Sequence, residues 1–168
     1  MADTFKKIAS VTVGAGGAAS MNFTSIPATY TDLCIKFSAR NTSTGQYAFY
    51  RFNNDATSVY TARVLTGDGT SATSITNTFT GNIANISTST DTANTFGNGE
   101  IYILNYAGST NKSSSVDAVN ENNATLAYAN LTANLWANSA AINRIDLLPT
   151  VGNFAQYSTA TLYGISKS

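Results

Sequence analysis

Three acidic residues are the candidates for acid–base chemistry in this chain: Glu100, Asp117 and Glu121. Glycoside hydrolases use two carboxyl groups, one as a proton donor and one as a nucleophile or base. Nothing in the spacing of the three residues brings two of them to one place, and acidic side chains mostly lie in solvent. We therefore predict no catalytic residue among them, and a carboxylate hydrolase is the least favoured function.

The chain contains no histidine, and this absence excludes most other catalytic arrangements. Histidine is the commonest general base and a frequent metal ligand, and both Ser/His/Asp and Cys/His nucleophilic groups require it. The single cysteine, Cys34, cannot form an intramolecular disulfide and is too few for a common zinc site. We predict that the protein is not an enzyme and has no cofactor or metal site.

Glycine- and amide-rich turns are candidates for binding ions or phosphate. The segment Gly14–Gly17 lacks the Lys and Ser or Thr that complete a phosphate loop, so a hairpin turn is predicted there. The segments Asn53–Asp55 and Asp117–Asn123 offer the oxygen ligands that calcium accepts, without the pattern of an EF-hand. Turn formation explains these residues, and calcium is the lesser alternative.

Aromatic residues could form contacts with a sugar or another subunit. A rigid ring buries a large area at little entropic cost, so an outward-facing ring suits either partner. Alternation along a strand divides such rings between two faces, and packing in the core is the default for most of them. The candidates are Tyr47, Phe49, Tyr50, Phe52, Tyr102, Tyr106 and Trp136.

The clearest strand pattern is in Thr31–Arg40, where apolar residues at every second position, such as Leu33, Ile35 and Phe37, alternate with polar ones. A period of two predicts a half-buried strand. Cys34 falls on the polar side, so we expect its thiol to be partly exposed or covered by a partner. No basic cluster lies nearby to lower its pKa, and we predict that it is unreactive.

Short strands separated by turn residues continue along the chain. The spacing is typical of an all-β sandwich or barrel. The segment Thr70–Asn98 is rich in Ser, Thr and Asn, and is predicted to be an extended loop with one edge strand; Asn98–Gly99 is predicted to be a turn. The other predicted strands are Lys6–Val13, Ala18–Thr24, Tyr47–Asn53, Ser58–Leu65, Gly99–Tyr106, Ser113–Asn120, Thr125–Trp136, Ala141–Leu148 and Ser158–Ile165.

One of these strands has an alternative interpretation. In Thr125–Trp136, Leu131 and Leu135 stand four residues apart in an alanine-rich context, which a helix also tolerates. Elsewhere apolar residues at helical spacing are scarce. Strand is therefore preferred throughout.

The composition describes a neutral domain with a polar surface. The 168 residues are 43% hydrophobic but only 11% charged, with nine basic and nine acidic residues. A zero net charge gives no attraction to nucleic acid or an anionic membrane, and lets identical copies pack without long-range repulsion. We predict one domain over residues 1–168 with a short arm at 1–5, no export signal, no membrane segment, and folding in a cytoplasm.

A set of segments along the chain forms a recognisable pattern: Tyr30–Leu33, Ala39–Arg40, Arg51–Asp55, Ile142–Pro149, Phe154 and Ser158–Ile165. The most specific of them is the ending "STATLYGI". Together, in matching order, these segments resemble small bacteriophage virion structural proteins of the capsid decoration (cement) and head- or tail-fibre type.

This resemblance implies a jelly-roll-like antiparallel β-sandwich located on the virion. Such proteins commonly form trimers, and a decoration protein binds the major capsid protein to stabilise the shell. Because the chain lacks a long repeat region, capsid decoration is favoured. The alternative is a tail- or head-fibre component or tip in which an exposed Tyr or Trp136 stacks on a host glycan.

Overall fold

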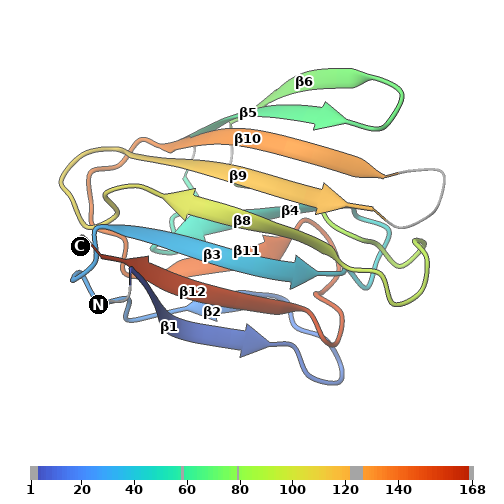
Figure 1. Ribbon diagram of the computed structural model, residues 1–168, viewed down its shortest axis with the longest axis horizontal. Coiled ribbons are helices and arrows are strands. Elements are labelled where there is room, and N and C mark those ends of the chain that lie inside the picture. Colours follow the sequence, from blue (N-terminus) through green and yellow to red (C-terminus); the bar gives the residue numbers. More distant parts are fainter. Residues whose placement is uncertain (1–3, 58, 79, 122–126, 167–168) are drawn as a thin grey trace.

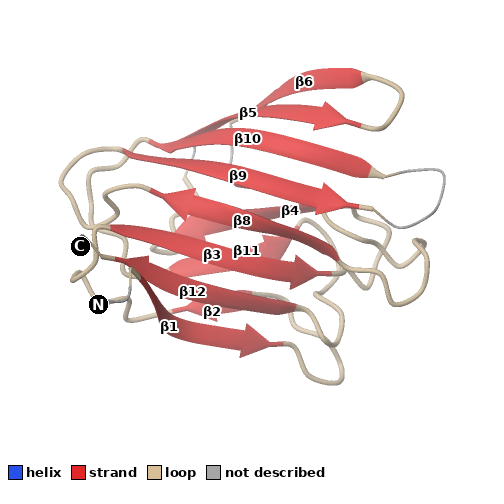
Figure 2. Cartoon of the chain, viewed as in Figure 1, coloured by secondary structure: helices blue, strands red, loops and turns tan. Residues whose placement is uncertain are grey.

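Twelve β-strands, with no helix among them, form the regular structure of residues 4–57, 59–78, 80–121 and 127–166, the part of the chain that the computed structural model describes. Figure 2 shows these strands joined by loops and turns. The strands are β1 (Phe5–Thr12), β2 (Met21–Phe23), β3 (Asp32–Ala39), β4 (Tyr47–Phe52), β5 (Tyr60–Gly67), β6 (Ala72–Asn77), β7 (Gly81–Asn85), β8 (Gly97–Ile103), β9 (Lys112–Asn120), β10 (Tyr128–Trp136), β11 (Ile145–Pro149) and β12 (Thr159–Ile165).

The strands form two antiparallel sheets packed face to face, so the predicted all-β sandwich is confirmed. The larger sheet has eight strands in the order β1-β12-β3-β8-β9-β10-β5-β6 and lies in front in Figure 1. The smaller sheet, with the order β2-β11-β4-β7, lies behind it. The face of the larger sheet that points away from the smaller sheet lies outside the sandwich, and we call this the outer face.

Eight of the strands form four antiparallel pairs. In the sequence these pairs are nested, so that each pair encloses the one before it. β4 pairs with β7, β3 with β8, β2 with β11, and β1 with β12. The members of successive pairs alternate between the two sheets. The remaining strands are two insertions: β5 and β6 follow β4, and β9 and β10 follow β8, and together they extend the larger sheet beyond β8.

The core lies between the sheets and follows the predicted period of two. Leu33, Ile35 and Phe37 of β3 all face inward, as do the alternate residues of β12 and β8 that pair with them. One continuous cluster of buried apolar side chains joins both sheets. Removal of these side chains from water supplies the hydrophobic part of the free energy that stabilises the fold.

Three predictions about boundaries are wrong. The predicted arm 1–5 includes Phe5, which belongs to β1 and pairs with Ile165; residues 1–3 lie outside the described residues. Thr70–Asn98 contains two strands, β6 and β7, instead of one. Asn98–Gly99 is not a turn but part of β8, because the missing side chain of Gly99 lets β9 pass within 2.4 Å of the place where a Cβ would stand.

Two local predictions are confirmed, the second of them in part. The segment 128–136 of the predicted strand Thr125–Trp136 is a strand and not a helix, and it pairs with β9 on one side and with β5 on the other. Residues 125 and 126 of that prediction lie outside the described residues. Residue 58 of the predicted strand Ser58–Leu65 lies outside them as well. Gly14–Gly17 is a turn in which the Gly17 N–H donates to the Gly14 carbonyl at 3.2 Å, but it is not the predicted hairpin turn, because β1 and β2 belong to different sheets. Gly16 and Gly17 both have positive φ, which glycine adopts without strain.

Candidate functional site

Two of the three candidate carboxylates are brought together. Glu100 on β8 and Asp117 on β9 are directly opposite each other on the outer face, and Lys36 of β3 lies opposite Glu100 on its other side. The Lys36 ammonium forms an ion pair with Glu100, and this hydrogen bond raises the pKa of Lys36. Glu121 follows β9 and borders a separate hollow of the surface. The three facing residues form a cross-strand charge group of the kind that stabilises sheets weakly.

Cys34 is fully buried, contrary to the expectation of a partly exposed thiol. It does lie on the outer face, since its neighbours Leu33 and Ile35 face the core. Its cross-strand partners there are Tyr163 and Tyr102, whose large rings flank the small thiol within one chain. Burial, followed by the charge of Glu100, raises the pKa of Cys34 to about 11.

The raised pKa predicts slow chemistry at Cys34. Thiolate is the reactive form, so a shift from 9.0 to about 11 lowers reactivity toward a disulfide reagent at pH 8 by about a hundredfold, and exclusion of the reagent adds to this. Because the folded-state pKa lies above the unfolded one, the stability that the buried thiol contributes below pH 9 decreases as the pH rises toward 11. Thiol titration should show one reactive group only after denaturation; rapid reaction of the folded protein would contradict this.

Most candidate aromatic residues belong to the core. Trp136 is 1% exposed, and its ring lies 5.5 Å from that of Phe52 and 6.3 Å from that of Tyr60, centroid to centroid. Its indole N–H donates to the Asp55 carboxylate at 2.9 Å. The expectation that Trp136 stacks on a glycan is therefore wrong, because no sugar reaches it. Tyr50, Phe52 and Tyr106 are buried as well, whereas Phe49 and Tyr102 are half-buried and Tyr47 is exposed.

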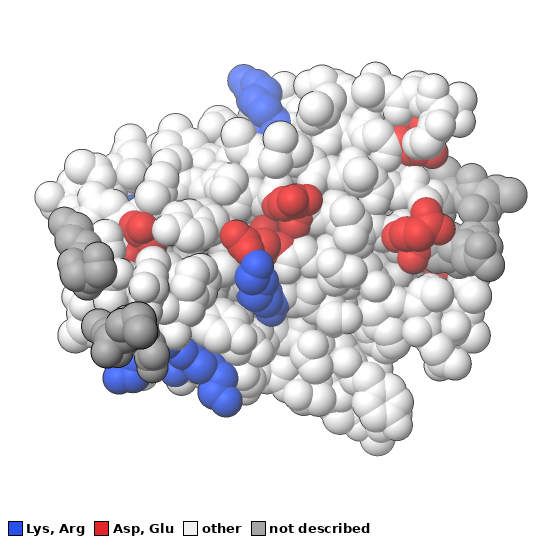
Figure 3. All heavy atoms as spheres, in the orientation of Figure 1, with Lys and Arg blue, Asp and Glu red and all other residues white. Residues whose placement is uncertain are grey.

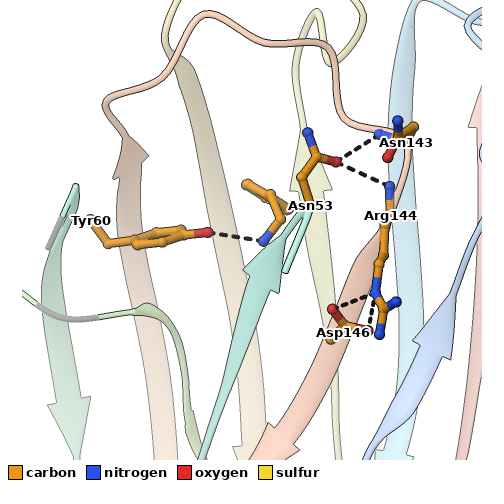
Figure 4. Close-up of polar contacts among 6 residues, drawn as sticks. Asn53, Tyr60, Asn143, Arg144 and Asp146 are labelled. Carbon is orange, nitrogen blue, oxygen red and sulfur yellow. Dashed lines mark hydrogen bonds and ion pairs between the residues drawn. The ribbon is translucent and has the colours of Figure 1, made fainter. Parts of the chain in front are cut away.

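The turn Asn53–Asp55 uses its oxygens inside the protein. Asn53 and Asn54 both have positive φ, as the turn prediction requires. Figure 4 shows the Asn53 side-chain oxygen accepting hydrogen bonds from the main-chain N–H groups of Asn143, at 2.9 Å, and Arg144, at 3.2 Å. The Asp55 carboxylate accepts from Thr57 and Trp136. These bonds tie the turn to the loop before β11 and to the core, which supports the structural interpretation over calcium.

The same loop anchors the smaller sheet. The Arg144 side chain donates to both carboxylate oxygens of Asp146 at 2.9 Å, and Asp146 is buried (Figure 4). The Tyr60 hydroxyl accepts a hydrogen bond from the Phe52 N–H at 2.9 Å, and burial raises the pKa of this hydroxyl to about 12.

Over the described residues, no group of three or more Cys, Asp or Glu side chains is placed to hold a metal ion. Residues 122 and 123 of the candidate calcium segment Asp117–Asn123 are outside that part of the chain.

In strand β10 the polar side chains face inward and the leucines face outward, which is the reverse of an ordinary sandwich strand. Its polar residues Asn130, Thr132 and Asn134 face inward and are at most 5% exposed. Leu131, which alternates with them, is 57% exposed on the outer face. Because Trp136 is also directed inward, the period of two carries every even-numbered residue of the strand to the inside.

Exposed apolar side chains gather on the outer face around β10. Leu131 lies opposite Leu65 of β5, and Ala129 lies opposite Val119 of β9. We call the outer apolar patch the set of exposed residues Leu65, Val119, Ala129, Leu131, Ala133 and Leu135. In Figure 3, the Lys, Arg, Asp and Glu residues occupy a few spots on this face, and most of the described surface around them belongs to other residue types. A cluster of exposed apolar side chains is typical of a surface that contacts another protein.

Hydrogen bonds to β7 fix the inward direction of Asn134 on β10. The Asn134 side-chain oxygen accepts the Asn82 main-chain N–H at 2.8 Å, and its amide nitrogen donates to the Asn82 carbonyl at 3.2 Å. The side chain thus takes the place of a neighbouring strand at the edge of the smaller sheet. An inward leucine at this position would leave both main-chain groups of Asn82 without partners.

Comparison of the chain with protein-family models, with curated proteins and with solved structures finds no match. The resemblance to phage structural proteins stays a prediction from the sequence. No helix that could span a membrane occurs in the described residues.

Sequence reasoning did not identify the outer apolar patch. Its signal was present, because Leu131 and Leu135 alternate with asparagine and threonine in the same way as core residues do. Alternation separates two faces without telling which of them is buried. The deciding contacts are the Trp136 packing and the Asn134 hydrogen bonds, which join residues far apart in the chain.

Proposed function

We propose that the protein is a bacteriophage virion structural protein, a capsid decoration protein whose copies bind one another and the major capsid protein. The observation that carries this proposal is the reversed strand β10, which directs asparagines inward and leucines outward. A soluble domain gains nothing by itself from exposed leucines on a regular sheet. A partner that covers them gains the free energy of removing their surface from water.

The connectivity of the strands supports a role in a virus particle. We infer that the eight strands of the four nested pairs form a jelly roll, a double-sheet architecture common in viral capsid and lectin domains. The insertions β5–β6 and β9–β10 supply all six residues of the outer apolar patch. Since one fold hosts many functions, the outer apolar patch is stronger support for the proposed role than the topology is.

A second copy of this chain is the partner that best suits the outer face. The protein has nine basic and nine acidic residues, so copies do not repel one another at long range. The face itself carries both signs, because Lys36, Glu100 and Asp117 are cross-strand neighbours on it. Arg63 lies on the same face two strands from Asp117, opposite Ala133. Charges of both signs permit complementary contacts between identical surfaces. The resemblance implies a trimer, which would then bind across neighbouring shell subunits.

The double substitution Leu65→Thr and Leu131→Thr tests the contact between copies. Both leucines are exposed, so folding stability should change by no more than about 0.5 kcal/mol per site, because little buried area is lost. Sedimentation equilibrium should show the unsubstituted protein as an oligomer and the double variant associating at least about tenfold more weakly. The control Val151→Thr, at an exposed loop site between β11 and β12, should associate normally.

Two outcomes would contradict the proposal. A protein that stays monomeric at the highest soluble concentration lacks the contact between copies. Quantitative mass spectrometry of purified particles gives the second test: a fixed stoichiometry with the major capsid protein supports decoration of the shell. A few copies per particle would place the protein in a tail or head fibre, and its absence would exclude a virion role.

A further inference from the structure

The strand β6 forms an open edge of the larger sheet. It pairs with β5 on one side, and no described strand lies on its other side, which is the upper edge of the molecule in Figure 1. Its six residues, Ala72–Asn77, include no charged residue, proline or glycine, and its pairing with β5 has no bulge. The first five of these residues are exposed, so neither face of the strand is covered. An edge of this kind is a template to which another strand can add.

The other three edges of the sandwich have features that hinder such pairing. The edge strand β1 carries the exposed residues Lys6 and Lys7, and a bulge interrupts its register with β12. The edge strand β2 is only three residues long. At the edge of β7, the Asn134 side chain already pairs with the main chain of Asn82. Proteins use lysines, bulges, short strands and coverage to prevent edge-to-edge contacts, and the described strand β6 has none of these.

The hydrogen bonds of the β5–β6 hairpin show which main-chain groups of β6 are directed outward. The Asp68 N–H donates to the Ser71 carbonyl at 3.2 Å, in the same register as the pairs between β5 and β6. Bonded and non-bonded pairs alternate along an antiparallel ladder. Ile75 therefore bonds to β5, whereas Ser74 and Thr76 direct their N–H and C=O groups away from it. Outward groups at every second residue are the pattern that an added strand recognises.

A second copy of the same strand complements this edge. Two copies related by a twofold axis through Ile75 lie antiparallel, and Ser74 of each copy then exchanges main-chain hydrogen bonds with Thr76 of the other. Ile75 is the one large apolar side chain of β6 and is 47% exposed, so placing it opposite its own copy removes apolar surface from water. Because β6 carries no charge, no like charges meet across the contact.

We propose that β6 pairs with β6 of a second copy in this register, so that the larger sheets of two molecules form one continuous sheet. The twofold axis is perpendicular to the sheet, and the outer apolar patches of both copies therefore lie on the same side. This edge contact is separate from the outer apolar patch and does not depend on it. A six-residue edge is smaller than a standard interface, so the edge contact is weak alone and adds to any other contact between copies.

Disulfide formation by the variant Ile75→Cys tests the edge contact. The Cα atoms of a non-hydrogen-bonded antiparallel pair are about 4.5 Å apart, which a disulfide can span. The natural thiol of Cys34 is fully buried and does not compete. With oxidised glutathione as the oxidant, Ile75→Cys should form a covalent dimer at least about tenfold faster than the control Val151→Cys, because pairing raises the effective concentration of the two thiols. Val151 is exposed in the loop between β11 and β12, and non-reducing electrophoresis measures both rates.

Two substitutions of Ser74 form a matched pair for the same measurement. Ser74→Pro removes an outward N–H but no hydrogen bond to β5, so it blocks the edge contact and keeps the hairpin. Combined with Ile75→Cys, it should slow dimer formation at least about tenfold, whereas Ser74→Ala keeps the N–H and should not. Thermal unfolding checks that each variant is folded. If the proline variant is not, Ser74→Lys, which adds the residue type that protects β1, should slow dimer formation in its place.

Equal rates of dimer formation for Ile75→Cys and Val151→Cys would overturn the proposal. So would a rate that neither Ser74→Pro nor Ser74→Lys lowers in a folded protein. The double substitution of Leu65 and Leu131 separates this contact from the one in the outer apolar patch. If Ile75→Cys forms the dimer as expected while the double substitution leaves association unchanged, the edge contact stands and the contact through the patch is wrong.

Discussion

Replacing Trp136 by alanine is expected to lower the free energy of unfolding by about 3–5 kcal/mol, the range for a large aromatic side chain removed from a core. Trp136 is 1% exposed and packs against Phe52 and Tyr60 at the point where the two sheets meet. The substitution also leaves the Asp55 carboxylate without its indole donor. Urea unfolding followed by circular dichroism measures the effect, since the variant has no tryptophan fluorescence.

Two further variants separate packing from hydrogen bonding at this site. Trp136→Phe keeps an aromatic ring in the core but removes the indole N–H, so it should retain part of the lost stability. Tyr157→Ala, at a site that is 69% exposed, should change the free energy of unfolding by no more than about 0.5 kcal/mol. A loss below about 1 kcal/mol in Trp136→Ala would contradict the assignment of this residue to the core.

The strands that bury one apolar face were predictable from the sequence. The alternation in Thr31–Arg40 identifies β3 and its inward residues, because the side chains of a strand change sides at every step. β6 gave no such signal, since its residues are exposed or nearly so on both faces. A strand of Ser, Thr and Asn that buries neither face looks like a loop in the sequence, and only its pairing with β5 makes it a strand.

The second face of a strand was harder to predict than the first. Cys34 was assigned to the polar side correctly but is buried, because Tyr102 and Tyr163 flank it from the neighbouring strands. Sequence alternation describes one strand, whereas burial on the outer face depends on which residues the register places next to it. The same limit applies to Glu100 and Asp117, which are 17 positions apart in the sequence and directly opposite in the sheet.

The reversal of β10 shows how tertiary contacts can override a pattern. Its sequence alternates as regularly as that of β3, so periodicity alone favours an inward apolar face. The interior at this position lies next to the edge of β7, whose main chain needs hydrogen-bond partners that leucine cannot supply. The same contacts therefore create both a polar layer inside the sandwich and an apolar patch outside it.

The substitution Gly99→Ala is expected to lower the free energy of unfolding by about 3 kcal/mol, the upper end of the usual cost of overpacking. A Cβ at this position would lie 2.4 Å from the main-chain oxygen of Asp117, 2.8 Å from Phe37 Cζ and 2.9 Å from Ala118 Cα. Two of these three atoms belong to the backbone of β9, so no side-chain rotation relieves the contact. Strand β9 has to move away from β8 and lose ladder hydrogen bonds.

Gly67→Ala is the matched control for this effect, because it also adds one methyl group to a strand glycine of the larger sheet. No atom lies within 4 Å of the Cβ that it would create at the end of β5. Its free energy of unfolding should stay within about 0.5 kcal/mol of that of the parent protein. If both variants unfold at the same urea concentration, the close approach of β8 and β9 is wrong. If only Gly99→Ala loses free energy of unfolding, the position of β9 depends on the absence of a side chain at Gly99. The base of the β9–β10 insertion then depends on this glycine as well.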